Sequence, residues 1–289
     1  MQGIVLKNQN GYFTVSGNDG NLLLCRSRGH LKRETDILVG DFVEYETNGE
    51  TEGIIVKVYS RKNQLYRPPV ANIDQIVLVS SIRTPDINPF LLDRMILLAE
   101  NADMTPIICI SKYDLAENES DRLCAEYKKA GYISLCTSLV THKGVDELRA
   151  YLQGNVVAFS GPSGTGKSSL LNLLLKESYF KSGEVSKHTG RGKTTTRHAE
   201  LVKFDGNSYL MDTPGYTFLE IERLNADDLA FLFKEFRPYI GNCYFNDCRH
   251  SSEPGCMVRK AVEEGMIEKR RYESYILILE ELKNKKKYR

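Results

Sequence analysis

The nine residues from Gly161 to Ser169 constrain this chain more than any other stretch. They read Gly-Pro-Ser-Gly-Thr-Gly-Lys-Ser-Ser and lie between an apolar run, Val156 to Phe159, and a leucine-rich run, Leu170 to Leu175. This order of strand, glycine-rich loop and helix is typical of a P-loop, in which backbone N–H groups and the amino end of a helix surround a phosphate. We expect Lys167 to contact the β- and γ-phosphates of a nucleotide and Ser168 to coordinate Mg²⁺. A glycine-rich turn that fits the pattern by chance is the other interpretation. The residues expected to bind the phosphates are Gly161, Pro162, Ser163, Gly164, Thr165, Gly166, Lys167, Ser168 and Ser169.

The composition of the chain is that of a soluble globular protein. A chain of 289 residues is long enough for two or three domains, and 27% charged with 41% apolar residues is ordinary for a soluble globular protein. The net charge of +1 means that any nucleic-acid surface must come from local clusters of basic residues. We find neither a signal-peptide pattern nor an apolar run near the roughly 20 residues that a membrane span needs. We therefore expect a cytoplasmic protein with reduced cysteines and no membrane contact.

The first 65 residues predict a small all-β module. Short apolar runs alternate with the turn signals Asn10-Gly11, Asp19-Gly20 and Asn48-Gly49, which suits a five-stranded Greek-key barrel such as an OB-fold. A basic loop, Arg26 to Arg33, lies between the third and fourth runs. It either binds the phosphate backbone of a nucleic acid or is a solvated loop without a ligand. The predicted strands are Ile4–Leu6, Tyr12–Val15, Leu22–Cys25, Phe42–Tyr45 and Ile54–Val58.

Beyond a linker at Arg61 to Val70, predicted strands alternate with helices, which indicates a parallel α/β sheet. Glu177 to Arg197 has few apolar residues, and we expect it to be mobile without a ligand. We divide the chain into domains at residues 1–65, 66–224 and 225–289. The predicted strands are Ile76–Ser80, Ile107–Ile110, Ile133–Cys136 and Val156–Phe159, followed by a hairpin of Leu201–Phe204 and Tyr209–Met211. The predicted helices are Phe90–Glu100, Glu119–Ala130, Val145–Leu152, one from Asn225 to about Phe236, and one from about Glu268 to the C-terminus.

Two loops after predicted strands indicate a guanine site. Ser111-Lys112-Tyr113-Asp114 is similar to the Asn-Lys-x-Asp motif of GTPases, whose carboxylate accepts hydrogen bonds from the guanine N1–H and amine. Adenine has an acceptor at N1 and no such amine, so the same carboxylate rejects it. Ser111 replaces the usual Asn and leaves fewer bonds to the surrounding loops. Thr137-Ser138-Leu139 matches the short loop whose backbone N–H meets the guanine O6, so we expect Ser138 and Leu139 to contact the base.

The Mg²⁺ and γ-phosphate end of the site is predicted by two further motifs. Asp212-Thr213-Pro214-Gly215 follows the hairpin strand, as the metal- and γ-phosphate-sensing loop of GTPases does. Thr194-Thr195-Thr196 offers another hydroxyl for Mg²⁺. The residues expected to serve hydrolysis are Lys167, Ser168, Thr195, Asp212 and Gly215.

The order of these motifs is unusual, because the guanine loops precede the P-loop. Joining the ends of a domain and opening a new connection keeps such a site intact, so the order indicates a circular permutation. With it, the chain resembles the circularly permuted, small-subunit-dependent GTPases of bacterial ribosome biogenesis over nearly its whole length. The resemblance rests on the motifs above, on residues 190–196 and on a cysteine cluster; Lys193 stands where that family commonly has histidine. It implies GTP hydrolysis stimulated by the small ribosomal subunit during late maturation of that subunit, with GTP or GDP, the subunit and its rRNA as partners of a monomer.

Cys243, Cys248, His250 and Cys256 supply four metal ligands within fourteen residues. Three thiolates and an imidazole close a tetrahedron around Zn²⁺ and leave no position for water, which predicts a structural zinc site. An iron–sulfur cluster is the alternative, although it prefers four thiolates. The remaining cysteines are expected to be packing residues: Cys25, Cys109, Cys124 and Cys136.

Together these patterns predict an α/β P-loop GTPase domain with a circularly permuted, mostly parallel sheet, an N-terminal OB-fold barrel and a C-terminal helical zinc-binding domain.

Tyr216 stands where many GTPases have the glutamine that orients water, so we expect slow intrinsic turnover. The subunit would complete the site, by placing His188 or His198 or by fixing the switch. A P-loop ATPase or kinase, and an RNA-binding assembly factor with a vestigial nucleotide site, are the alternatives. The residues expected to hold RNA, besides the basic loop, are Lys283, Lys285, Lys286, Lys287 and Arg289.

Overall fold

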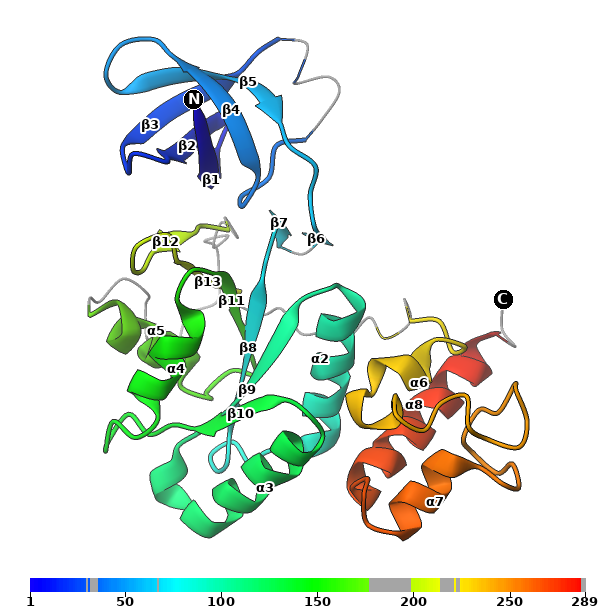
Figure 1. Cartoon of the computed structure of the whole chain (residues 1–289). Helices are drawn as coiled ribbons and strands as arrows, with labels where there is room; N and C mark the ends of the chain where they lie inside the picture. Colours follow the sequence, from blue (N-terminus) through cyan, green and yellow to red (C-terminus); the bar gives the residue numbers. More distant parts are fainter. Residues whose placement is uncertain are drawn as a thin grey trace, which may run out of the picture.

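The computed structural model describes residues 1–29, 31, 36–66, 68–176, 199–213, 221 and 224–286. Figure 1 shows three parts: a β-barrel, a sheet with helices on both faces, and a C-terminal group of helices beside α2 (Pro89–Asn101). The predicted fold class is confirmed. No helix in the described part of the chain has the length and apolar character that crossing a membrane requires.

The barrel contains all five predicted strands and closes in the order β1-β2-β3-β5-β4. Alternate side chains point inward, as the period of a strand requires, and Val5, Val15, Cys25 and Ile55 are fully buried there. A closed barrel leaves no free sheet edge, which suits so small a module. The strands are β1 (Gln2–Gln9), β2 (Tyr12–Gly17), β3 (Leu22–Ser27), β4 (Phe42–Thr47) and β5 (Glu52–Val58).

The segment expected to be a linker forms a short antiparallel pair, β6 (Gln64–Tyr66) with β7 (Pro69–Ala71). Val70 is fully buried, and it bridges Val39 of the barrel. Arg61 donates to both carboxylate oxygens of the buried Asp41, at 2.7 and 2.8 Å. The connection is therefore packed against the barrel by charge and by apolar contact.

The central sheet has six strands in the order β10-β9-β8-β11-β13-β12. The first five are parallel, and β12 is an antiparallel edge strand, as the predicted hairpin requires. The order reverses direction between β8 and β11, a topological switch point at which open α/β sheets bind ligands. The strands are β8 (Gln75–Ser81), β9 (Thr105–Ser111), β10 (Ile133–Cys136), β11 (Val156–Ser160), β12 (Val202–Lys203) and β13 (Tyr209–Asp212).

Helices cover both faces of the sheet because its strands are apolar on both faces. Ile76 and Leu78 of β8 pack with α2 and α3, whereas the alternate Val77 and Val79 pack with α4 and α5. Asn88 caps α2, since its side chain accepts from the Leu91 N–H at 3.1 Å. The other helices are α3 (Glu117–Lys129), α4 (Val145–Leu152) and α5 (Lys167–Leu175), preceded by a short 3₁₀ turn, η1 (Tyr113–Leu115).

The C-terminal part corrects one prediction and adds one helix. The single helix expected from Asn225 to Phe236 is wrong: α6 (Leu229–Leu232) ends at Phe233, and a 3₁₀ turn, η3 (Lys234–Phe236), follows. The break turns the rings of Phe233 and Phe236 onto each other, 4.9 Å apart, in a core with Tyr275. Packing of these rings outweighs the local helical preference. The further helices are α7 (Met257–Glu263), which was not predicted, and α8 (Lys269–Lys286), which was.

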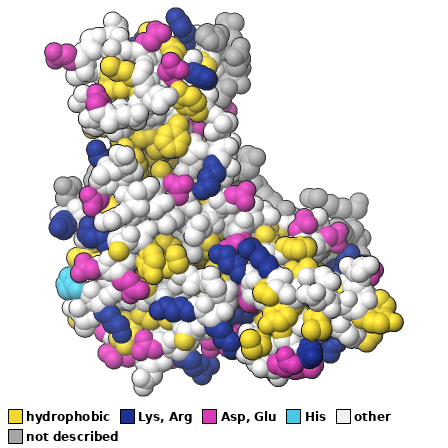
Figure 2. Space-filling model, in the orientation of Figure 1, with side chains coloured by type: hydrophobic (Ala, Val, Ile, Leu, Met, Phe, Trp, Pro, Cys, Tyr) yellow, Lys and Arg dark blue, Asp and Glu magenta, His cyan; other side chains and the backbone are white. Residues whose placement is uncertain are grey.

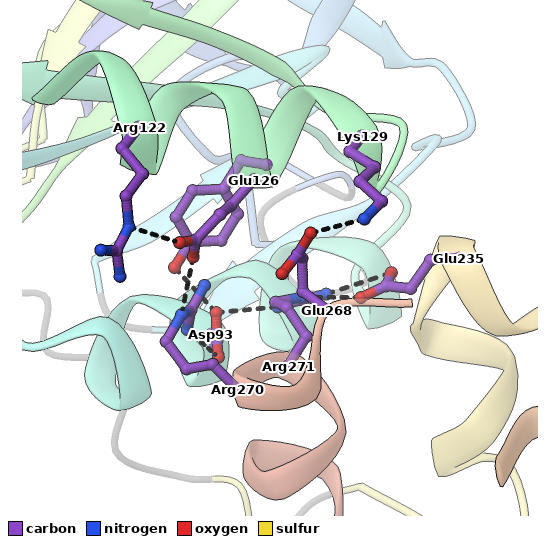
Figure 3. Close-up of polar contacts among 9 residues, drawn as sticks. Asp93, Arg122, Glu126, Lys129, Glu235, Glu268, Arg270 and Arg271 are labelled. Atoms are coloured by element: carbon purple, nitrogen blue, oxygen red, sulfur yellow. Dashed lines mark hydrogen bonds and ion pairs between the residues drawn. The ribbon is translucent and has the colours of Figure 1, made fainter. Parts of the chain in front are cut away.

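Buried charges attach α8 to the helices that cover the central sheet (Figure 3). Arg271 is fully buried and pairs with Asp93 of α2 at 2.8 Å and with Glu235 at 2.7 Å. The neighbouring Arg270 pairs with Asp93 at 2.9 Å and with Glu126 of α3 at 3.1 Å. One helix thus contacts both helices on that face of the sheet, so the C-terminal part is docked through paired charges as well as apolar packing.

Candidate active site and metal centre

Four of the predicted nucleotide motifs follow strands that end at the same edge of the sheet. Ser111 ends β9, Thr137 follows β10, Gly161 follows β11 and Asp212 ends β13. These strands are parallel, so their carboxyl ends meet at one edge. The tertiary structure therefore gathers loops from residues 111 to 212 around a single place.

The glycine-rich loop has the backbone that a phosphate cradle needs. Gly161 passes so close to β8 that a Cβ there would lie 2.1 Å from the Val79 carbonyl oxygen. Gly166 has a φ of +84°, a left-handed conformation that glycine adopts without strain, and it directly precedes α5. Thr165 Oγ1 donates to the Pro162 carbonyl at 3.0 Å, which closes the loop on itself. Because α5 begins directly after Gly166, the N–H groups of its first turn, which have no acceptor within the helix, lie next to this loop.

Lys167, Ser168 and Asp212 form one polar group at the start of α5. Lys167 Nζ contacts Asp212 Oδ1, and Ser168 Oγ donates to Asp212 Oδ2 at 3.1 Å. The Lys167 and Asp212 side chains are 10% and 11% exposed, so the pair is shielded from most solvent. A cation, a carboxylate and a hydroxyl are thus held together where a phosphate and its metal would enter.

The first guanine loop is bonded directly to the P-loop. Lys112 adopts a left-handed conformation with φ +58°, and its ammonium donates to the Gly164 carbonyl at 2.8 Å and to the Thr84 carbonyl. Ser111 Oγ donates to the Thr165 carbonyl at 2.6 Å. The serine at this position therefore still bonds to the P-loop, although it is shorter than the usual Asn. These contacts fix the spacing between the two loops.

The second guanine loop orients Asp114. Ser138 Oγ donates to Asp114 Oδ1 at 2.5 Å and accepts from the N–H groups of Val140 and Thr141, at 3.1 and 3.2 Å. The Ser138 N–H is used within the loop, because it donates to the Lys143 carbonyl at 3.2 Å. Leu139 N–H has no acceptor among the described residues, so it is the amide of this turn that remains for a ligand.

A cavity of about 240 Å³ joins the two halves of the site. Asp114 and Leu139 line it from the guanine loops, and Thr165, Gly166 and Leu170 line it from the P-loop and α5. Its walls combine apolar side chains with a carboxylate on one side, which suits a flat aromatic ring that carries hydrogen-bond donors. The remaining lining residues are Ser111, Lys112, Leu115, Thr137 and Val140.

Some predicted residues lie elsewhere, and some lining residues were missed. Tyr113 is buried away from the cavity; its hydroxyl donates to Asp121 at 3.0 Å, and the Lys143 ammonium lies 3.2 Å from its ring centroid. Leu115 and Val140 line the cavity but were not predicted. Each is an apolar residue next to a predicted loop, and each is exposed, at 53% and 77%.

Several predicted residues and segments lie outside the described part of the chain: residues 177–197, Thr194, Thr195, Gly215, Tyr216, His188, His198, Lys32, Arg33, Lys287 and Arg289.

The predicted metal ligands converge. The donor atoms of Cys243, Cys248, His250 and Cys256 all lie within 4.8 Å of one another. His250 Nδ1 is 3.5 Å from both Cys243 Sγ and Cys256 Sγ. Burial raises the pKa of the Cys248 thiol to about 12, so forming a thiolate there requires a nearby cation. Three sulfurs and one ring nitrogen at this spacing can hold a metal ion with tetrahedral geometry.

The other cysteines are buried in the barrel and the sheet domain, apart from this cluster. Burial raises the pKa of the Cys109 thiol to about 12, which keeps it neutral beside Thr137 Oγ1 at 3.2 Å. Cys124 Sγ contacts Cys136 Sγ between α3 and β10. Cys25 is fully buried inside the barrel.

Comparison with known families and structures agrees with this architecture. The RsgA GTPase model matches residues 58–222, and the RsgA N-terminal domain model matches residues 2–55. The "Small ribosomal subunit biogenesis GTPase RsgA" of Caldanaerobacter subterraneus subsp. tengcongensis is 43% identical over 291 residues, which cover 100% of this chain and 98% of the relative. The protein of the same name from Geobacillus kaustophilus is 43% identical over 290 residues, 99% of this chain and 98% of the relative.

Two solved structures share the fold. One, described as YloQ, a circularly permuted GTPase, is 31% identical with a TM-score of 0.84, and the match covers 98% of this chain and 95% of that one. The other, YjeQ from Thermotoga maritima, is 37% identical with a TM-score of 0.81, and the match covers 97% and 98%. The permuted order of motifs in this chain is therefore shared with a solved GTPase.

Proposed function

The chain belongs to the RsgA GTPase family, and from this membership we propose that it hydrolyses GTP to GDP and phosphate, stimulated by the small ribosomal subunit, in the late maturation of that subunit. One observation in the structure carries the proposal: Asp114 and the P-loop residues Thr165 and Gly166 line the same cavity. A base and its phosphates can therefore be held at once. The permuted order of the motifs does not separate the two halves of the site.

Asp114 would select guanine. Its carboxylate, oriented by the Ser138 hydroxyl, can accept from the N1–H and amine of guanine, while the Leu139 N–H donates to O6. Adenine reverses the hydrogen-bond pattern at N1 and lacks the amine, so it would leave the carboxylate unpaired in a largely apolar cavity. The stem of Lys112 would lie along one face of the base, with its ammonium still bonded to the P-loop.

The phosphates would enter at Lys167. In the structure the Lys167 ammonium is neutralised by Asp212, and a γ-phosphate would replace that carboxylate as its partner. Asp212 and Ser168 would then hold Mg²⁺, which supplies charge neutralisation at the β- and γ-phosphates when it is bound. Thr195 would contribute a second hydroxyl to the metal, and Gly215 a backbone N–H to the γ-phosphate. Tyr216 in place of glutamine predicts slow turnover until the subunit fixes the site.

The metal centre would hold zinc in a structural role. The edge of a tetrahedron with Zn–S bonds of about 2.3 Å is about 3.8 Å, close to the spacing of the four donor atoms in the cluster. All four ligands come from the protein, so no position remains for water or substrate. Cys256 both contributes to the cluster and precedes α7, where its sulfur accepts from the Arg259 N–H at 3.5 Å. The metal would therefore fix the start of α7 and the loop before it.

We assign one role to each domain: an RNA-binding barrel at residues 1–65, the GTPase domain at residues 66–224 and a zinc-binding helical domain at residues 225–289. The barrel, through Arg26 and its basic loop, and the end of α8, through Lys283, would contact rRNA. We propose that the protein acts as a cytoplasmic monomer, because its partner is a ribosomal particle and the nucleotide site is built from one chain.

GTP turnover measured with and without small ribosomal subunits tests this function. We expect a slow basal rate and a rate at least tenfold higher with subunits, with ATP unable to replace GTP. Lys167→Ala, which removes the phosphate contact, should abolish both rates and serves as the control for contaminating activity. Equal rates with and without subunits would contradict the stimulated mechanism, and turnover of ATP at the GTP rate would contradict the assigned base.

A further inference from the structure

The chain that enters the hairpin β12–β13 bonds to the barrel. β12 pairs with β13 over only two residues, Val202 and Lys203. Immediately before them, Glu200 forms an antiparallel bridge with Lys7 of β1, and Leu201 N–H donates to the Leu6 carbonyl at 2.9 Å. Glu200 and Leu201 therefore form a short strand-like addition to β1, beyond the part of β1 that pairs with β4.

A bulge in β1 makes this addition possible. The register of β1 with β2 shifts between Val5 and Lys7, which leaves Leu6 without a partner on β2. On its other edge, β1 pairs with β4 only over Gln2–Ile4. The Leu6 carbonyl is thus free to accept from Leu201, and the Leu6 side chain is turned out of the barrel into the core that contains Leu201. A β-bulge commonly re-aims one side chain in this way.

Side chains reinforce the backbone contact on both arms of the hairpin. Lys7 Nζ lies 3.0 Å from Glu200 Oε2, with the two side chains 28% and 31% exposed. On the second arm, the Tyr209 hydroxyl donates to the Ser16 Oγ of β2 at 3.4 Å. Figure 2 shows hydrophobic side chains gathered at the narrow junction between the barrel and the rest of the molecule. Ile4 and Leu6 of β1 share one core with Leu201 and with Tyr209 and Met211 of β13.

We propose that Lys7 and Glu200 are positioning residues for GTP hydrolysis: they fix the hairpin whose far end carries Asp212, so that subunit binding to the barrel is transmitted to the Mg²⁺ site. Tyr209, at the barrel, and Asp212, at the phosphate site, lie on one strand and are about 10 Å apart at the usual rise per residue. The carboxylate assigned to the metal is thus carried by a strand of the barrel-anchored hairpin. The inference rests on the proposed function.

Charge reversal tests the pair. We expect Lys7→Glu and Glu200→Lys each to lower the subunit-stimulated kcat at least threefold, with the KM for GTP within twofold of the wild type. The double variant, which restores an opposite-charge pair, should recover kcat to within twofold. Lys62→Glu is the control, because it reverses one charge of another surface pair, Lys62 with Asp74 at 3.3 Å, whose side chains are 52% and 36% exposed, and it should leave kcat unchanged.

Two further measurements separate positioning from other causes. Glu200→Gln removes a negative charge and cannot weaken attraction to RNA, so a lower stimulated kcat in this variant, with subunit co-sedimentation unchanged, supports the positioning role. Melting temperatures within about 3 °C of the wild type are expected for such exposed sites. Variants with unchanged kcat, or a double variant no better than the singles, would overturn this inference alone. A wild-type protein that subunits do not stimulate would overturn the proposed function as well.

Discussion

Removing Arg271 is predicted to be among the most destabilising single changes in the C-terminal part of the protein. Its guanidinium is fully buried and donates to Asp93 at 2.8 Å and to Glu235 at 2.7 and 3.3 Å. In Arg271→Met, Asp93 keeps two partners, because Arg270 and the Tyr127 hydroxyl still donate to it at 2.9 and 2.8 Å. Burial, and then the Asp93 charge, raise the pKa of Tyr127 well above its usual value, so the phenol remains a neutral donor.

Glu235 is the group that Arg271→Met leaves uncompensated. Its side chain is 5% exposed, and within the described part of the chain Arg271 supplies both of the side-chain donors to its carboxylate. Breaking a buried ion pair by removing one partner costs about 3–5 kcal/mol, most of it from the charge that remains. We therefore expect the free energy of unfolding to fall by about 3–5 kcal/mol. Arg271→Met combined with Glu235→Leu should recover most of this loss, because both charges are then replaced by apolar groups.

Urea unfolding followed by circular dichroism at 222 nm measures the effect, since α8 and its neighbours are helical. Arg122→Met is the control: Arg122 is 84% exposed and pairs with Glu126 at 3.3 Å, so its loss should cost less than about 0.5 kcal/mol. GDP affinity should not change in any of these variants, because the network in Figure 3 lies among α2, α3, η3 and α8, and none of its residues lines the nucleotide cavity. A loss below about 1 kcal/mol for Arg271→Met, or a double variant less stable than the single, would refute the reasoning.

Two other predictions concern the nucleotide and metal sites. Asp114→Ala should weaken GTP binding by about 10²- to 10⁴-fold, the worth of two charge-assisted hydrogen bonds, measured by fluorescent-nucleotide titration. Glu117→Ala, which removes another carboxylate near the end of the same loop, is its control, and retained affinity in Asp114→Ala would argue against the guanine contact. Cys248→Ala, or removal of the metal by a chelator, should unfold the cluster and α7 while GDP affinity stays within about threefold; an equal loss of GDP affinity would show that the metal site supports the nucleotide site directly.

The sequence by itself determined the five strands of the barrel, the alternation of strands and helices, and the motifs of the nucleotide and metal sites. It could do so because these depend on local signals: a period of two in the strands, glycine where the backbone turns sharply, and donor atoms a few residues apart. The prediction failed where distant residues decide local structure. The helix expected from Asn225 to Phe236 breaks because Phe233 and Phe236 pack on Tyr275, some 40 residues further along.

Only the tertiary structure decided how the parts are joined. It brought Asp114 and Gly166 to one cavity, placed Ser111 on the P-loop carbonyl of Thr165, and docked α8 through Arg271. It also attached the entry to the hairpin of Asp212 to the bulge at Leu6 of the barrel. Contacts of this kind depend on which chain segments become neighbours after folding, and a carbonyl left free by a bulge or a charge buried between helices has no signature in the local pattern of residues.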